Sequence, residues 1–83
     1  MKMIFAPTPT EARQVRDLLG LDPDEWQVAR IGSRWHGRRF TKVLILGVHN
    51  PRNPLSGEHL DHWIGEHVRT RMDVNCEMNI LAQ

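Results

Sequence analysis

The sequence predicts an α/β domain with the element order β-α-β-β-α-β and a mostly parallel, Rossmann-like sheet. Short apolar runs at residues 3–6 and 43–46 are typical of buried strands. Two amphipathic segments, each preceded by a capping residue, predict helices between the strands. Helices that separate apolar strands favour crossover connections on a parallel sheet.

A ferredoxin-like α+β sandwich has the same element order and is the alternative. The two folds differ at residues 32–40, a stretch with two glycines that joins the second and third strands. A hairpin in this stretch would make the two strands antiparallel, whereas a crossover would make them parallel. The sequence leaves both arrangements open.

Residues 3–6 are expected to form the first strand, and a helix is expected over residues 9–19. Thr8 fits the N-cap, Pro9 the first helical position, and Glu11 the third residue after the cap. Gly20 is a natural end for this helix. Its buried stripe is expected to contain Ala12, Val15, Leu18 and Leu19.

The middle of the chain predicts two more strands. Asp22 begins a stretch expected to form one helical turn at most, after which Trp26 covers the edge of the core. A second strand is expected over residues 27–31 and a third over 41–48. The apolar run at 43–46 favours a central strand that is buried on both faces.

The second helix is expected at about residues 57–71, with Ser56 as its cap and a hydrophobic staple between Leu55 and Leu60. Its buried stripe is expected to consist of Leu60, Trp63, Ile64, Val68 and Met72. Apolar and polar residues then alternate over 74–80, which predicts a last strand near an edge of the sheet.

Length and composition indicate one globular domain, residues 1–83. The chain is 40% hydrophobic and 25% charged, which is ordinary for a folded domain. No apolar run approaches the roughly 18 residues that a membrane-spanning helix needs. Cys76 is the single cysteine, which favours a reducing compartment such as the cytoplasm and excludes a Cys-x-x-Cys zinc site.

Charge is unevenly distributed. The whole chain has a net charge of +1, but residues 27–53 hold six lysines and arginines and no acid, so the remainder carries −5. This segment predicts the binding surface. The candidate binding residues are Arg30, Arg34, Trp35, His36, Arg38, Arg39 and Lys42.

Three interpretations of this basic loop stay open. Its arginines and Trp35 could dock an acidic surface of a partner protein, which is the main hypothesis. The same residues could bind nucleic acid, with guanidinium groups on phosphates and the indole stacked on a base. Alternatively, the loop is solvated and its arginines pair with acids in residues 11–25 and 58–66.

Three further places are weaker candidates. The spacing of His59, His62 and Glu66 could hold a zinc or iron ion, which would make a minimal metal-dependent enzyme, but a solvated helix face is favoured. The turn at His49, with the start of the first helix, could bind a small anion at the carboxyl edge of the sheet. Cys76 is expected to pack in the core.

Two segments resemble the core of superfamily 2 helicases. Residues 4–15 are similar to that family's strand-to-helix motif, an apolar strand followed by Ala-Pro-Thr and a helix that begins with Ala-Arg-Gln. Residues 37–46 are similar to the glycine and strand that lead to the family's acidic motif. The resemblance implies a parallel sheet and a reduced fragment of the helicase core, such as a small phage or mobile-element protein could use for binding.

The chain departs from that family where the family carries its chemistry. It has no Gly-x-x-x-x-Gly-Lys-Ser/Thr loop, and Gly47 and Val48 stand where the family has Asp-Glu. Phosphate binding and magnesium binding therefore lack their residues. We expect no catalytic residues, no cofactor, no resident metal and no ATP hydrolysis.

Overall fold

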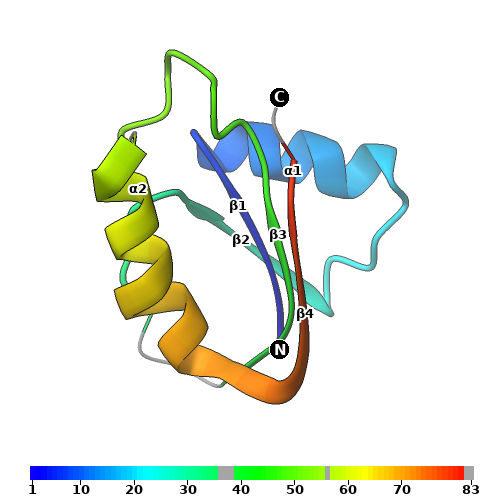
Figure 1. The fold of residues 1–83 in the computed structure, drawn as a ribbon. Helices are drawn as coiled ribbons and strands as arrows, with labels where there is room; N and C mark the ends of the chain where they lie inside the picture. Colours follow the sequence, from blue (N-terminus) through cyan, green and yellow to red (C-terminus); the bar gives the residue numbers. More distant parts are fainter. Residues whose placement is uncertain (36–38, 56, 82–83) are drawn as a thin grey trace.

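The computed structural model describes residues 1–35, 39–55 and 57–81 (Figure 1). It confirms the predicted order of strands and helices. The elements are β1 (Lys2–Ala6), α1 (Pro9–Leu18), β2 (Trp26–Arg30), β3 (Phe40–Ile45), α2 (Gly57–Trp63), the π-helical turn η1 (Ile64–Val68), the 3-10 turn η2 (Arg69–Arg71) and β4 (Met72–Ile80).

The four strands form one parallel sheet in the order β2-β1-β3-β4. Lys2 of β1 lies opposite Trp26 of β2 on one side and opposite Lys42 of β3 on the other. Since β1 separates β2 from β3, these two strands are not a hairpin. The ferredoxin-like alternative is therefore wrong, and the Rossmann-like arrangement is confirmed.

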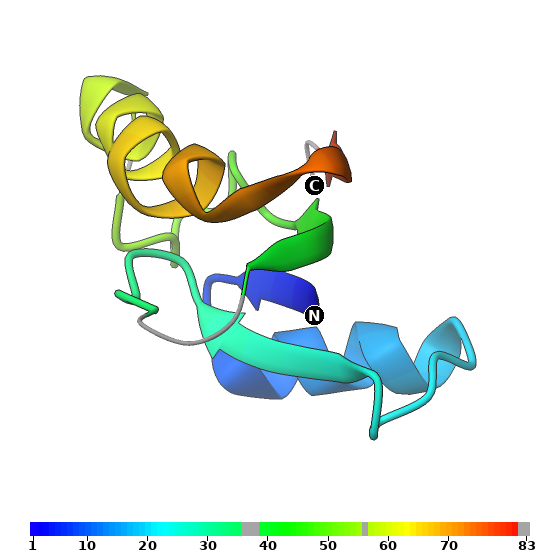
Figure 2. The ribbon, with the colours of Figure 1, turned by 90° about the horizontal axis from the view of Figure 1, so that it is seen from below.

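Helices cover both faces of the sheet, giving three layers (Figure 2). In β1, Ile4 and Ala6 face α1, while Met3 and Phe5 belong to the core cluster under α2 and η1. All four of these residues are at most 1% exposed. Phe40, Val43 and Ile45 of β3 belong to the cluster under α2. Half-buried Leu44, and buried Leu46 directly after β3, belong to the cluster under α1, which confirms that the third predicted strand is interior.

The ends of α1 are as predicted. Thr8 is the N-cap, and its hydroxyl accepts a hydrogen bond from the Glu11 backbone N–H (3.3 Å). At the other end Gly20 has a φ of +66°, and the Leu21 N–H donates to the carbonyl of Arg16 (2.9 Å). This pattern is a Schellman C-cap, in which glycine adopts the left-handed conformation without a steric cost.

The predicted buried stripe of α1 is only half right. Ala12 is buried and Val15 half-buried, but Leu18 is 85% exposed and Leu19 56% exposed. The last turn of α1 extends beyond the strands that the helix covers (Figures 1 and 2). Periodicity identifies the side of a helix that faces the core, but it does not show how far the core extends along the helix.

The second helical segment spans residues 57–71, as expected, but it changes geometry along its length. One α-helical stretch is followed by a π turn and a 3-10 turn. Met72 is half-buried, and the rest of the expected stripe is buried: Leu60, Trp63, Ile64 and Val68. The proposed cap, Ser56, lies outside the described residues. No described helix is long and apolar enough to cross a membrane.

Residues 31–35, here called the crossover, begin the connection from β2 to β3 and contain no helix. Ile31 is buried, and its N–H donates to the carbonyl of Ala6 (2.8 Å). The Trp63 indole N–H donates to the carbonyl of Ser33 (2.9 Å). The crossover therefore packs on the α2 face of the sheet.

β4 forms one edge of the sheet, as the alternation of its residues predicted. Met72 lies opposite Phe40, but the next pair joins Lys42 to Glu77, so residues 73–76 bulge away from β3. Val74 in this bulge is 100% exposed. Among residues 1–35, 39–55 and 57–81, β3 is the only strand that pairs with β4.

Candidate functional site

The parallel crossover separates the basic residues that are neighbours in the sequence. Arg30 ends β2 at the carboxyl edge of the sheet, whereas Arg39 directly precedes β3 at the amino edge. A strand of this length spans roughly 15 Å at about 3.3 Å per residue. The expected single basic patch is therefore divided between two ends of the molecule.

Arg30 and Arg34 remain close in the fold. A turn closes between them, in which the Ser33 N–H donates to the carbonyl of Arg30 (3.0 Å) and Gly32 has a φ of +97°. Both arginines are exposed and belong to no ion pair within the described parts of the chain. The two side chains thus carry uncompensated positive charge at the carboxyl edge.

Lys42 lies on the opposite face of the sheet from the crossover. It lines a groove of ≈ 220 Å³ on the α1 face, together with residues such as Leu19, Leu44 and Glu77. The crossover packs on the α2 face, so Lys42 cannot share a contact surface with Arg34. Grouping these two residues into one loop was wrong, because the hairpin that would have joined them does not form.

Trp35 is not the exposed indole that was expected. It is half-buried and packs against the cluster under α2. Its indole nitrogen is also buried, and it meets no hydrogen-bond acceptor within residues 1–35, 39–55 and 57–81. His36 and Arg38, which were also expected to take part in binding, lie outside the described residues.

A small recess lies beside Arg30 and was not foreseen. It has a volume of ≈ 300 Å³ and is bounded by residues of the crossover and of the loop that follows β3: Arg30, Ile31, Gly32, Ser33, Pro54 and Leu55. A Cβ at Gly32 would come within 3.4 Å of Leu55 Cδ1. Pro54 and Leu55 are 22 residues or more from Gly32, so no local pattern could indicate this contact.

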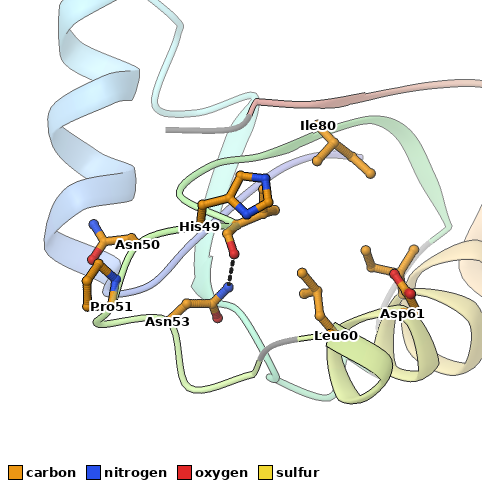
Figure 3. Close-up of a pocket in the computed structure, with 10 residues that line it drawn as sticks. His49, Asn50, Pro51, Asn53, Leu60, Asp61 and Ile80 are labelled. Carbon is orange, nitrogen blue, oxygen red and sulfur yellow. Dashed lines mark hydrogen bonds between the residues drawn. The ribbon is translucent and has the colours of Figure 1, made fainter.

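A larger cleft of ≈ 620 Å³ opens at the carboxyl ends of β3 and β4 (Figure 3). His49 and Asp61 lie on opposite sides of it, and its apolar lining includes Leu60, Ile64 and Ile80. Asn53 stiffens the loop after β3 by donating to the carbonyl of Val48 (3.3 Å). The sequence pointed to the turn at His49 but not to this apolar lining.

The cleft offers two titratable side chains and no prepared anion site. The start of α1 already carries Glu11, whose carboxylate lies 3.9 Å from the Arg52 guanidinium. A bound anion would have to compete with this carboxylate for the positive end of the helix. The small-anion hypothesis therefore gains no support from the geometry.

The described residues contain no group of three or more His, Cys, Asp or Glu side chains that could hold a metal ion. His59 and His62 are exposed on α2, but Glu66 lies beyond the change to π geometry in η1. A π turn contains more residues per turn than an α-helix, so the spacing assumed for three ligands on one face does not apply.

Cys76 is half-buried on β4 and packs against the cluster under α2, as expected. Burial raises the pKa of its thiol above the ordinary value of 9.0, and the nearby charges of Asp73 and Glu77 raise it further. The thiol is therefore protonated and weakly nucleophilic at neutral pH.

Comparisons of the chain with protein-family models, with curated proteins and with solved structures found no match. The assignment of a function therefore depends on the surface just described.

Proposed function

We propose that the protein is a non-enzymatic binding module that docks an acidic surface of a partner protein at the carboxyl edge of its sheet. Arg30 and Arg34 supply the charge, and the recess beside Arg30 accepts an apolar side chain of the partner. The observation that supports this most is that two neighbouring exposed arginines, within a segment that contains no acid, have no described ion-pair partner.

The recess favours a protein partner over nucleic acid. A phosphate backbone would satisfy the arginines but would leave the recess empty, whereas a protein can insert a leucine or an aromatic side chain. Trp35, on which a base could have stacked, is packed against the core. Ion pairs at an exposed rim contribute roughly 0.2–1 kcal/mol each, and a desolvated anchor about 2 kcal/mol or more.

The proposed setting is the reducing cytoplasm, which agrees with a single unpaired cysteine. A regulator encoded by a phage or mobile element is the proposed type of protein, because residues 4–15 and 37–46 resemble parts of a helicase core. Neither part of this setting is needed for the binding test.

The test compares two double variants that remove the same charge from different places. Arg30→Ala/Arg34→Ala changes the carboxyl edge, and Arg39→Ala/Lys42→Ala changes the amino edge and the α1 face. The probes are two fluorescent glutamate-rich peptides, with and without leucines, and a random-sequence DNA duplex. Binding is measured by fluorescence anisotropy at two salt concentrations.

The first double variant is expected to weaken binding of the leucine-containing peptide about tenfold, which is 1.4 kcal/mol. The second is expected to change it much less, and the peptide without leucine should bind more weakly to the wild type. Equal losses in the two variants would show a non-specific charge effect and overturn the proposal. Preference for the duplex would replace it with the nucleic-acid hypothesis.

A further inference from the structure

The exposed edge of the sheet has a sequence that is complementary to itself. We propose that β4 pairs antiparallel with β4 of a second copy of the chain, across a twofold axis at Cys76. The two sheets would then form one continuous eight-stranded sheet. This inference is independent of the proposed partner surface, which lies at the carboxyl edge beside β2.

The bulge leaves part of β4 without a strand partner among the described residues. Residues 73–76 fall between the two regions that pair with β3. A recess of ≈ 340 Å³, lined by Thr41, Asp73, Val74 and Asn75, separates them from that strand. An extended segment whose N–H and C=O groups lack strand partners is a template for pairing with another chain.

In the part of β4 that pairs with β3, the backbone N–H and C=O groups of alternate residues point outward, as pairing with a second copy requires. The Leu81 N–H donates to the carbonyl of Ile45 on β3 (2.8 Å). Because the direction of these groups alternates along a strand, those of Met78 and Ile80 point to the open side. Residues whose backbone groups point outward in one copy must lie opposite residues whose backbone groups point outward in the other copy.

The alternation of side chains along β4 requires the same alignment of the two strands. Even-numbered positions of β4 are all apolar: Met72, Val74, Cys76, Met78 and Ile80. Odd-numbered positions are all polar: Asp73, Asn75, Glu77 and Asn79. Directly opposite residues in an antiparallel pair share a face, so even must meet even to continue the apolar stripe across the junction.

Three registers place even positions opposite even positions and also pair most of the residues of the two strands. Charge decides among these three. An axis at Asn75 would place Asp73 opposite Glu77, and an axis at Glu77 would place that residue opposite itself. Like charges directly opposite each other are destabilising. An axis at Cys76 pairs all nine residues of β4 and sets each carboxylate opposite an asparagine.

A junction of one strand pair is small. It buries less than the roughly 1,200 Å² that is typical of stable complexes. We therefore expect a reversible dimer, with a dissociation constant on the order of tens of micromolar. The dimer would form in the presence of reductant, because the backbone and the apolar stripe hold it together.

The register can be tested through the single cysteine. With the axis at Cys76, the two Cα atoms would lie about 5.5 Å apart, within the range that a disulfide spans. Copper–phenanthroline at alkaline pH is therefore expected to convert most of the wild type to a cross-linked dimer. The matched control is Val74→Cys/Cys76→Ser, in which the two cysteines would lie about 14 Å apart.

The control separates pairing from chance collision. Val74 is fully exposed and Cys76 only half-exposed, so random encounters would cross-link position 74 faster. Cross-linking of the wild type but not of the control supports the register. Cross-linking of both, of neither, or of the control alone overturns it.

Sedimentation under reducing conditions provides a second measurement. The wild type and Val74→Thr are expected to sediment as concentration-dependent dimers, and Val74→Pro as a monomer. Proline blocks strand pairing, but residue 74 does not pair with β3, so the circular dichroism of the monomer should not change. A monomeric wild type, or a dimeric Val74→Pro, would contradict the proposal.

Discussion

Trp35 lies beside an arginine in the sequence, yet its indole packs against the core. We predict that Trp35→Ala lowers the free energy of unfolding by about 2 kcal/mol, less than for a fully buried tryptophan because the side chain is half-exposed. Urea denaturation measures the change. Arg34→Ala, an exposed neighbour, should stay within about 0.5 kcal/mol of the wild type.

The local sequence could not show that Trp35 is packed inward. An indole among arginines is typical of an interface, and the cluster against which it packs is assembled from β1, β3 and the second helix, most of it remote in sequence. An equal stability for Trp35→Ala and the wild type would restore the first interpretation, in which the indole is free for binding.

The Cys76 thiol gives a prediction for pH. Its pKa is raised in the folded chain, mainly by burial, so the unfolded thiol ionises first as the pH rises through about 9. The folded state then binds more protons than the unfolded state, and stability falls above this pH. Below it, the protonation of this thiol has no effect on stability.

Iodoacetamide modification measures the same effect directly. The folded chain should react several-fold more slowly than the urea-unfolded chain at about pH 8, and the rate should keep rising beyond pH 9. The measurement should use the Val74→Pro variant, which is expected to be monomeric, so that a second copy of the chain does not cover the Cys76 thiol. Equal rates in the folded and unfolded chains would contradict the raised pKa.

At the scale of single elements, the N-cap of α1 was identified from Thr8, Pro9 and Glu11 alone. We predict that Thr8→Ala costs about 1 kcal/mol of stability, because it removes the hydroxyl that accepts the Glu11 N–H. Thr10→Ala is the matched control, because Thr10 is an exposed threonine only two residues further along the chain. Thermal or urea unfolding should show a loss only for the first variant.

The crossover is an element that depends on a distant contact. Trp63 donates its indole N–H to the carbonyl of Ser33, which fixes the crossover against α2. We predict that Trp63→Phe costs about 1–2 kcal/mol, since it keeps an aromatic ring in the core but leaves a part-buried carbonyl unpaired. Hydrogen exchange should rise in residues 31–35 more than in α1.

At the same scale, the sequence predicted the regular features of the elements better than their irregularities. The caps of α1, the stripe of the second helix and the alternation of β4 are local patterns, and the structure confirms them. The π turn at Ile64–Val68 and the bulge at 73–76 have no local signal. Both arise where a helix or strand must fit a neighbour that is remote in sequence.

For the whole molecule, the order of the elements was predictable, but their pairing was not. Residues 32–40 could have formed a hairpin or a crossover, and the surface differs completely between the two. A hairpin would have gathered Arg30 and Lys42 at one end of the molecule. The parallel sheet places them at opposite ends, which is why only part of the basic segment remains a candidate site.

The strand order β2-β1-β3-β4 also has a consequence for folding kinetics. No two neighbouring strands of the described sheet are joined by a hairpin. Paired residues are 24 positions apart in β1–β2, 40 in β1–β3 and 32 to 35 in β3–β4. The contact order is therefore high for a chain of 83 residues. Stopped-flow refolding is expected on the order of milliseconds to seconds, and a microsecond phase that recovers the whole native signal would contradict it.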